Sequence, residues 1–203
     1  MLAKIHSFLE KISTWSVWCG GGALLLCAIM VTLDVTARKI FNVTLSGSDE
    51  ITGYVFAAST TWAYSYCLFN RANVRIDALY NRLGPWPRAI LDLVGLLLLL
   101  LYIGVLASKA IVVYQETLEF NATAQTTLAT PLWIPQIFWV SGLVFFFLSL
   151  LFVTIYTTVA VIKKDLPLVA RLAGVRTVEE ELEQETHGTV VVTARASAEA
   201  GSK

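Results

Sequence analysis

The sequence predicts an all-α integral membrane protein with four transmembrane helices and short amphipathic helices at the membrane surface. The chain of 203 residues is 56% hydrophobic and only 15% charged, and its mean hydropathy of +0.67 is rarely reached by soluble domains. The apolar residues gather in four long runs, and nearly all the charge lies between the runs. Each run can supply about 20 helical residues, enough to cross a hydrocarbon core about 30 Å thick. A helix is expected because it satisfies the backbone hydrogen bonds within one segment.

The transmembrane domain is predicted to cover residues 15–162, preceded and followed by polar segments. The spans are expected at about residues 15–37, 50–69, 90–114 and 136–162. Residues 1–14 are predicted to form a cytoplasmic amphipathic segment, because Leu2, Ile5, Leu9 and Ile12 recur at helical spacing. Residues 163–203 begin with two lysines and include a cluster of glutamates, which predicts a solvated and partly disordered cytoplasmic tail.

The first two spans and the loop between them carry small and acidic residues at positions that indicate helix packing and the start of the second helix. Gly20 to Gly22 lie in the first span, where small residues allow another helix to approach closely. Ser48 is a candidate N-cap of the second helix, and Asp49 and Glu50 complement the positive end of its dipole.

The second loop and the third span contain a further predicted surface helix and two features of charge placement. Residues 76–83 place apolar side chains on one helical face, which predicts a second helix at the surface. Arg88 and Asp92 are spaced as an i,i+4 pair at the start of the third span. Lys109 is expected near the other end of that span, where its stem can extend toward water.

The basic residues are distributed very unevenly between the two predicted sides of the membrane. Twelve of the fifteen fall in the N-terminal segment, the second loop and its junction with the third span, or the C-terminal tail. The positive-inside rule therefore places both termini in the cytoplasm. The formal net charge is zero, so no bulk field attracts nucleic acid.

The motifs of enzymes and metal sites are missing from the sequence. No His-x-x-x-His, Cys-x-x-Cys, Walker or Gly-x-Ser-x-Gly motif occurs, so no catalytic, metal or cofactor site is predicted. Asp34, Asp92 and Lys109 all lie near span ends rather than at the midplane, where a carrier usually places its ionisable groups. Asp34 and Arg38 share a helix face, and either lock the first helix to a neighbour or form a weak boundary pair.

The order of these motifs resembles the small, DctQ-like membrane subunit of tripartite ATP-independent periplasmic (TRAP) transporters. The matching features are Arg38 at the end of the first span, Glu50 with Asp49 opening the second, and a basic motif from Arg71 to Asp77. Many relatives carry histidine within that basic motif, where this chain has Asn73. The segment Ala129-Thr-Pro-Leu-Trp-Ile resembles the family's entry to the fourth helix. The resemblance covers about residues 15–162.

The resemblance implies a non-catalytic subunit in the bacterial inner membrane. Its partners would be membrane lipids, a large multi-span permease subunit that moves an organic acid with a cation gradient, and a periplasmic solute-binding protein that delivers the acid. The alternative is a stand-alone four-span membrane adaptor or small membrane enzyme. The candidate subunit-interface residues are Asp34, Arg38, Asp49, Glu50, Arg71, Arg75 and Asp77.

Overall fold

The computed structural model describes residues 2–44, 46–72 and 84–174. Apart from one isolated β-bridge between Thr123 and Pro131, the regular structure of these residues is helical, as predicted. The helices are α1 (Leu2–Phe41), α2 (Ser48–Phe69), α4 (Pro85–Glu119), α5 (Trp133–Ile162) and α6 (Leu166–Ala173). The four predicted spans each lie within one of the four long helices.

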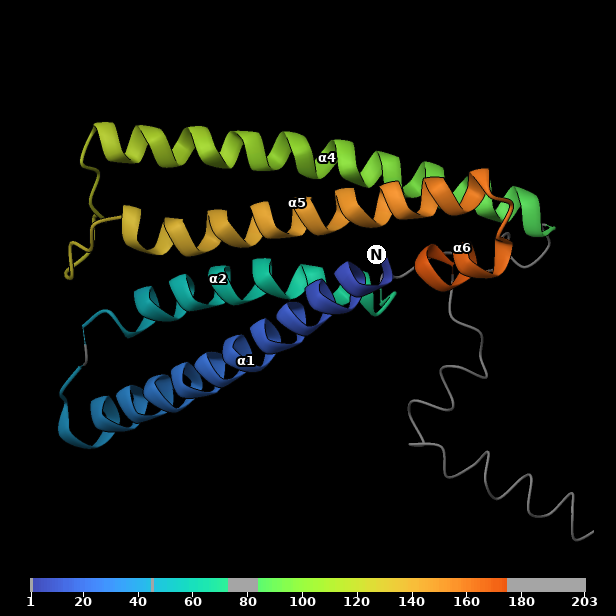
Figure 1. Ribbon diagram of the computed structural model, residues 1–203. Coiled ribbons are helices and arrows are strands. Elements are labelled where there is room, and N and C mark those ends of the chain that lie inside the picture. Colours follow the sequence, from blue (N-terminus) through green and yellow to red (C-terminus); the bar gives the residue numbers. More distant parts are fainter. Residues whose placement is uncertain (1, 45, 73–83, 175–203) are drawn as a thin grey trace, which may run out of the picture.

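The four long helices lie side by side in a single layer, in the order α1, α2, α5, α4 (Figure 1). α1 packs mainly on α2, and α4 packs on α5 and on the short helix α6. α2 and α5, which come from different hairpins, form the contact between the two halves of the layer. The connections α1–α2 and α4–α5 lie at one end, here called the turn end, and α6 lies at the opposite end, here called the α6 end (Figure 1).

Three of the four long helices are long and apolar enough to cross a membrane, judged by length and composition. These segments are Lys4–Phe41, Pro85–Glu119 and Trp133–Ile162. α2 is not among them, so the prediction of four transmembrane helices is supported for three. The reason lies in its composition, because α2 contains many hydroxyl-bearing residues, such as Thr60, Thr61 and Tyr64.

Residues 2–41 form one uninterrupted helix, so the predicted N-terminal amphipathic segment is not a separate element. A helix of 40 residues is about 60 Å long, twice the thickness of the hydrocarbon core. The apolar spacing of residues 2–12 continues without a proline or a helix-ending signal into the first span, and nothing in the sequence stops the helix between them. The first turns of α1 therefore continue the helix of the predicted span, and His6 within them packs on Phe69 of α2 and Tyr156 of α5.

Glycines set the close contacts within the layer. At Gly20 of α1 an added Cβ would lie 3.1 Å from Ser59 Cβ of α2, and the Ser59 hydroxyl donates to the Gly20 carbonyl at 3.3 Å. At Gly142 of α5 an added Cβ would lie 2.4 Å from Thr61 Oγ1 of α2. Close approach of this kind lets helices gain van der Waals contact in lipid, where apolar burial gives little driving force. The predicted role of small residues in the first span is confirmed at Gly20, whereas an added Cβ at Gly21 or Gly22 would meet no atom within 4 Å.

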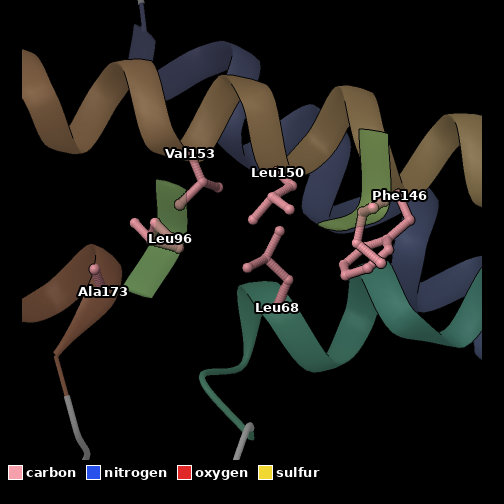
Figure 2. Packing of buried hydrophobic residues seen from close by; sticks show 7 residues of the cluster. Leu68, Leu96, Phe146, Leu150, Val153 and Ala173 are labelled. Atoms are coloured by element: carbon pink, nitrogen blue, oxygen red, sulfur yellow. The ribbon is translucent and has the colours of Figure 1, made fainter. Parts of the chain in front are cut away.

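The main buried cluster joins four helices toward the α6 end. Figure 2 shows its side chains turned toward one another from α2, α4, α5 and α6. The cluster consists of Leu68, Leu96, Ile103, Phe146, Leu150, Val153 and Ala173. α5 supplies three of them and is the central element of the packing, with 44% of its most apolar stretch buried, against 6% for α1.

The short helix α6 lies in the segment that the sequence analysis assigned to the polar tail. Asp165 caps it, because its carboxylate accepts a hydrogen bond from the Leu168 N–H at 3.2 Å. Val169 and Ala173 are buried against the ends of the long helices. The beginning of the tail is therefore part of the folded structure.

Candidate subunit-contact sites

Asp34 is the most deeply buried charged residue at the turn end. Its side chain is 2% exposed, and its Oδ2 lies 2.9 Å from Arg38 Nη2, which confirms the predicted ion pair. The hydroxyl of Ser48, the first residue of α2, donates to the same oxygen at 3.1 Å. Asp34 also lies at the positive end of the α2 dipole, which favours a negative charge. The carboxylate thus locks α1 to α2 within the chain.

The start of α2 differs from the prediction at the N-cap. Gly47 occupies the cap position and has a left-handed backbone with φ 97°, while Ser48 is already helical and uses its hydroxyl on Asp34. A side chain at Gly47 would be strained by this φ and would also overlap the Leu128 side chain. The prediction was wrong because the buried carboxylate of Asp34 competes for the serine hydroxyl.

Glu50 joins α2 to the connection between α4 and α5. Its carboxylate accepts hydrogen bonds from the Tyr54 hydroxyl at 2.7 Å and from the Thr126 hydroxyl. The connection folds back on itself through the Ala124 N–H, which donates to the Thr130 carbonyl at 2.9 Å. This fold places Leu128 against Gly47. Glu50 is therefore engaged within the chain, in a contact that links the two hairpins.

Arg38 and Asp49 are the predicted residues of the turn end that face outward. The Arg38 side chain is 55% exposed even though one of its nitrogens contacts Asp34. Asp49 is exposed in the first turn of α2. These two side chains can reach a partner without breaking a contact of the described fold.

Arg71 belongs to the α6 end. It follows α2 with φ 51°, and its Nη1 donates to the Ala170 carbonyl of α6 at 3.2 Å. A cation at the last carbonyls of a helix complements the negative end of the dipole. Asp92 of α4 is also buried at this end, with an exposed fraction of 4%. Arg75 and Asp77, the other two candidates of the basic motif, lie outside the described residues.

The N-terminal turns of α1 also pack at the α6 end. The His6 ring lies edge-on to Phe69 of α2, with a centroid distance of 5.1 Å, and 6.5 Å from the Tyr156 ring of α5. The α6 end therefore collects contacts from α1, α2, α5 and α6.

Three parts of these sites were not predicted, although two of them carry a local signal in the sequence. Asp165 before Leu-Pro, followed by apolar residues at helical spacing, is the start signal of α6. The pair Ser46-Gly47 marks a turn and could have placed the glycine at the cap. The contacts of Thr126 and Leu128 with α2 had no such signal, because they join residues 76 or more positions apart in the chain.

A comparison with models of protein families identifies the family of this chain. The family model of the DctQ component of tripartite ATP-independent periplasmic transporters matches residues 27–161, about two thirds of the chain. The chain belongs to this family. No curated protein and no solved structure matches it. Members of the DctQ family are the small membrane component of a TRAP transporter, so the protein is a non-catalytic membrane component and not an enzyme.

The range matched by the DctQ model contains the whole turn end and stops before α6. Asp34, Glu50 and the α4–α5 connection lie inside it, and so do all seven candidate interface residues. The first 26 residues of the chain and α6 lie outside it. Family membership excludes the small-enzyme alternative. TRAP transporters of this kind work as a complex of the DctQ component, a larger permease and a binding protein.

Proposed function

We propose that this chain is the scaffolding subunit of a TRAP-type secondary transporter in the bacterial inner membrane. It binds a large permease subunit and holds the static part of that subunit in place in the bilayer. The complex takes up an organic acid that a periplasmic binding protein delivers, and a cation gradient drives the uptake. The DctQ family assignment supports the general role, and the shape of the chain supports the specific role of a scaffold.

The observation that carries the proposal is the single-layer arrangement of the long helices. A solute path through a membrane protein needs a polar lining that several helices separate from lipid. Four helices in a row enclose no such space, because α1 and α4 lie at opposite ends of the row. A row does offer a long apolar face, and 6% of the most apolar stretch of α1 and 22% of that of α4 are buried. Such a layer suits attachment along the side of a larger membrane protein.

We also propose that α2 crosses the membrane as the fourth span. Its 22 residues measure about 33 Å, close to the thickness of the hydrocarbon core. Its position between α1 and α5 shields it from lipid on two sides. Several of its hydroxyl groups are satisfied within the helix, since Thr60 donates to the Phe56 carbonyl at 2.8 Å and Thr61 to the Ala58 carbonyl at 2.9 Å, whereas the Ser65 hydroxyl is buried without a partner. These contacts offset the polarity that lowers the hydropathy of α2.

Four spans place both termini on one side of the membrane, and three spans place them on opposite sides. We expect both termini in the cytoplasm, following the excess of basic residues near them. Reporter fusions after Lys203 and before Met1 test this: green fluorescent protein should fluoresce at both ends, and alkaline phosphatase should be inactive at both. Phosphatase activity at one end only would show that α2 does not cross.

The exposed charges at the turn end are the best candidates for contact with a partner. Asp34, Glu50 and Arg71 are engaged within the chain, so we assign them to holding the helices together. Arg38 and Asp49 project outward, and we assign them to the contact with the permease or the binding protein. Arg75 and Asp77 stay candidates for a contact at the other membrane surface, based on the family's basic motif.

Charge reversal at Arg38 is expected to weaken the complex. Arg38→Glu replaces a half-exposed cation, and placing like charges in an interface costs several kcal/mol. Co-expression with the permease subunit and purification through a tag on this chain should recover at least tenfold less permease. Lys39→Glu is the matched control, because Lys39 is also exposed but points about 100° away around the helix. Equal recovery from both variants would reject the assignment of Arg38.

A further inference from the structure

A groove runs along the layer between α1 and α2 on the half nearer the start of α1. Its volume is about 510 Å³, and it is open along one side. Its lining includes small residues, such as Gly20 and Ser59, and the rings of Trp15 and Trp62. Phe8 and Lys11 line the groove toward the start of α1. The groove is therefore lined mainly by apolar and small side chains, and Lys11 is the one charged residue among them.

The length of the groove matches one leaflet of a bilayer. Lys11 and Gly20 are nine residues apart on a continuous helix, which corresponds to about 14 Å. Half of a hydrocarbon core of about 30 Å is 15 Å. Trp15, which is 73% exposed, lies one turn inward from Lys11, as expected for a tryptophan at the interface between lipid and water. The acyl chain of a lipid that enters the groove beside Lys11 would therefore reach the bilayer midplane near Gly20.

The positive charge of Lys11 indicates which lipid headgroup the groove would favour. Lys11 is exposed, and Lys4 lies two helical turns before it on the same face of α1. Lysines at this depth attract anionic lipids by about 1 kcal/mol each. The apolar stem of Lys11 can follow the groove while its ammonium group reaches the level of the phosphates. No acidic residue lines the groove.

We propose that this groove is a binding site for one anionic phospholipid, with an acyl chain against Gly20 and Ser59 and the phosphate beside Lys11. The site goes beyond the proposed function and requires only that α1 spans the membrane. A bound lipid would fill the space between α1 and α2 below their contact at Gly20 and stiffen the first hairpin.

Native mass spectrometry of the full-length chain in mild detergent tests the proposal. The probes are dioleoyl phosphatidylglycerol, which is anionic, and dioleoyl phosphatidylcholine, which is zwitterionic. One phosphatidylglycerol should stay bound at collision energies that remove phosphatidylcholine. Lys11→Glu should lower the retention of phosphatidylglycerol about tenfold. Cys19→Trp should do the same by filling the groove, since Cys19 is an exposed lining residue.

Lys109→Glu is the matched control, because Lys109 is an exposed lysine on α4 far from the groove, and it should leave retention unchanged. Circular dichroism should show the same helix content in all variants, so that loss of lipid cannot come from unfolding. Equal retention of both lipids by the unmodified chain, together with no effect of Lys11→Glu, would overturn the proposal. Unchanged lipid retention with loss of permease co-purification in Cys19→Trp would also overturn it and assign the groove to a protein partner.

Discussion

Replacement of Gly142 by alanine should destabilise the protein by about 1–3 kcal/mol, the range for overpacking a close contact. The new Cβ would lie 2.4 Å from Thr61 Oγ1, 2.7 Å from Trp62 Cδ1 and 2.9 Å from Thr61 Cβ. Thr61 Cβ is attached directly to the α2 backbone, so rotation of a side chain cannot relieve the overlap. α2 and α5 must move apart, and they form the contact between the two hairpins. The midpoint of thermal unfolding in detergent should fall.

Gly95→Ala provides a control for which stability is expected to stay the same or to rise. Gly95 lies in the interior of α4, and an added Cβ there meets no atom within 4 Å. Because glycine costs up to about 1 kcal/mol relative to alanine in a helix, this variant should be as stable as the original protein or more stable. Adding Thr61→Ala to Gly142→Ala removes the nearest overlapping atom and should recover part of the loss. Equal midpoints for Gly142→Ala and Gly95→Ala would show that α2 and α5 do not meet at this glycine.

Removal of the buried carboxylate at the turn end is expected to have a similarly large effect. Asp34→Ala removes the ion pair with Arg38, the acceptor of the Ser48 hydroxyl and a negative charge at the start of α2. Hydrogen bonds to charged groups contribute about 1.5–3 kcal/mol, whereas the pair with the half-exposed Arg38 adds little. A loss of about 2–3 kcal/mol is expected, measured as a lower midpoint of thermal unfolding.

Asp49→Ala is the matched control for Asp34. It also removes a carboxylate from the start of α2, but Asp49 is exposed, so only its interaction with the helix dipole is lost, at about 0.3–1 kcal/mol. Ser48→Ala should fall between the two, because it removes one hydrogen bond and leaves the ion pair in place. If Asp34→Ala and Asp49→Ala reduce stability equally, then the carboxylate of Asp34 does not lock α1 to α2.

The helices were predictable because hydrophobicity acts locally along the chain. Each apolar run is long enough to require a helix in a membrane, and the pair of Asp34 and Arg38 lies within one helix turn. The apolar character of α2 was overestimated, because the same run that contains its leucine and phenylalanine residues also contains several serines and threonines. The proposal that it crosses the membrane relies on its position between α1 and α5, which no local pattern reveals.

The arrangement of the helices could not be predicted from the sequence. The order α1, α2, α5, α4 depends on contacts such as Gly142 with Thr61, which are far apart in the chain. The hydrogen bond from Ser48 to Asp34 could not be predicted for a related reason. A serine before a helix usually caps that helix, but here Asp34 lies close enough in space to accept the hydroxyl of Ser48. From the sequence, Glu50 is expected only to interact with the dipole of α2. Its hydrogen bond with Thr126 depends on the α4–α5 connection lying beside it in space.

These features together describe a subunit whose polar contacts hold its own helices in a row and whose apolar faces stay open. The turn end is fixed by Asp34 and Glu50, and the α6 end by Arg71 and the buried cluster around Leu150. A row of helices with exposed apolar sides fits the scaffolding role proposed above. Arg38 and Asp49 are exposed at the turn end and are the residues proposed above to contact that partner.

The central claim is that this protein works as part of a larger membrane complex. The most direct test is to purify the tagged full-length chain in mild detergent from the membranes of the cells that encode it and to measure the mass of the particle. We predict a particle well above the 22.3 kDa of the chain that contains one much larger multi-span protein. A particle of 22.3 kDa, or a whole multiple of it without another protein, would contradict the account.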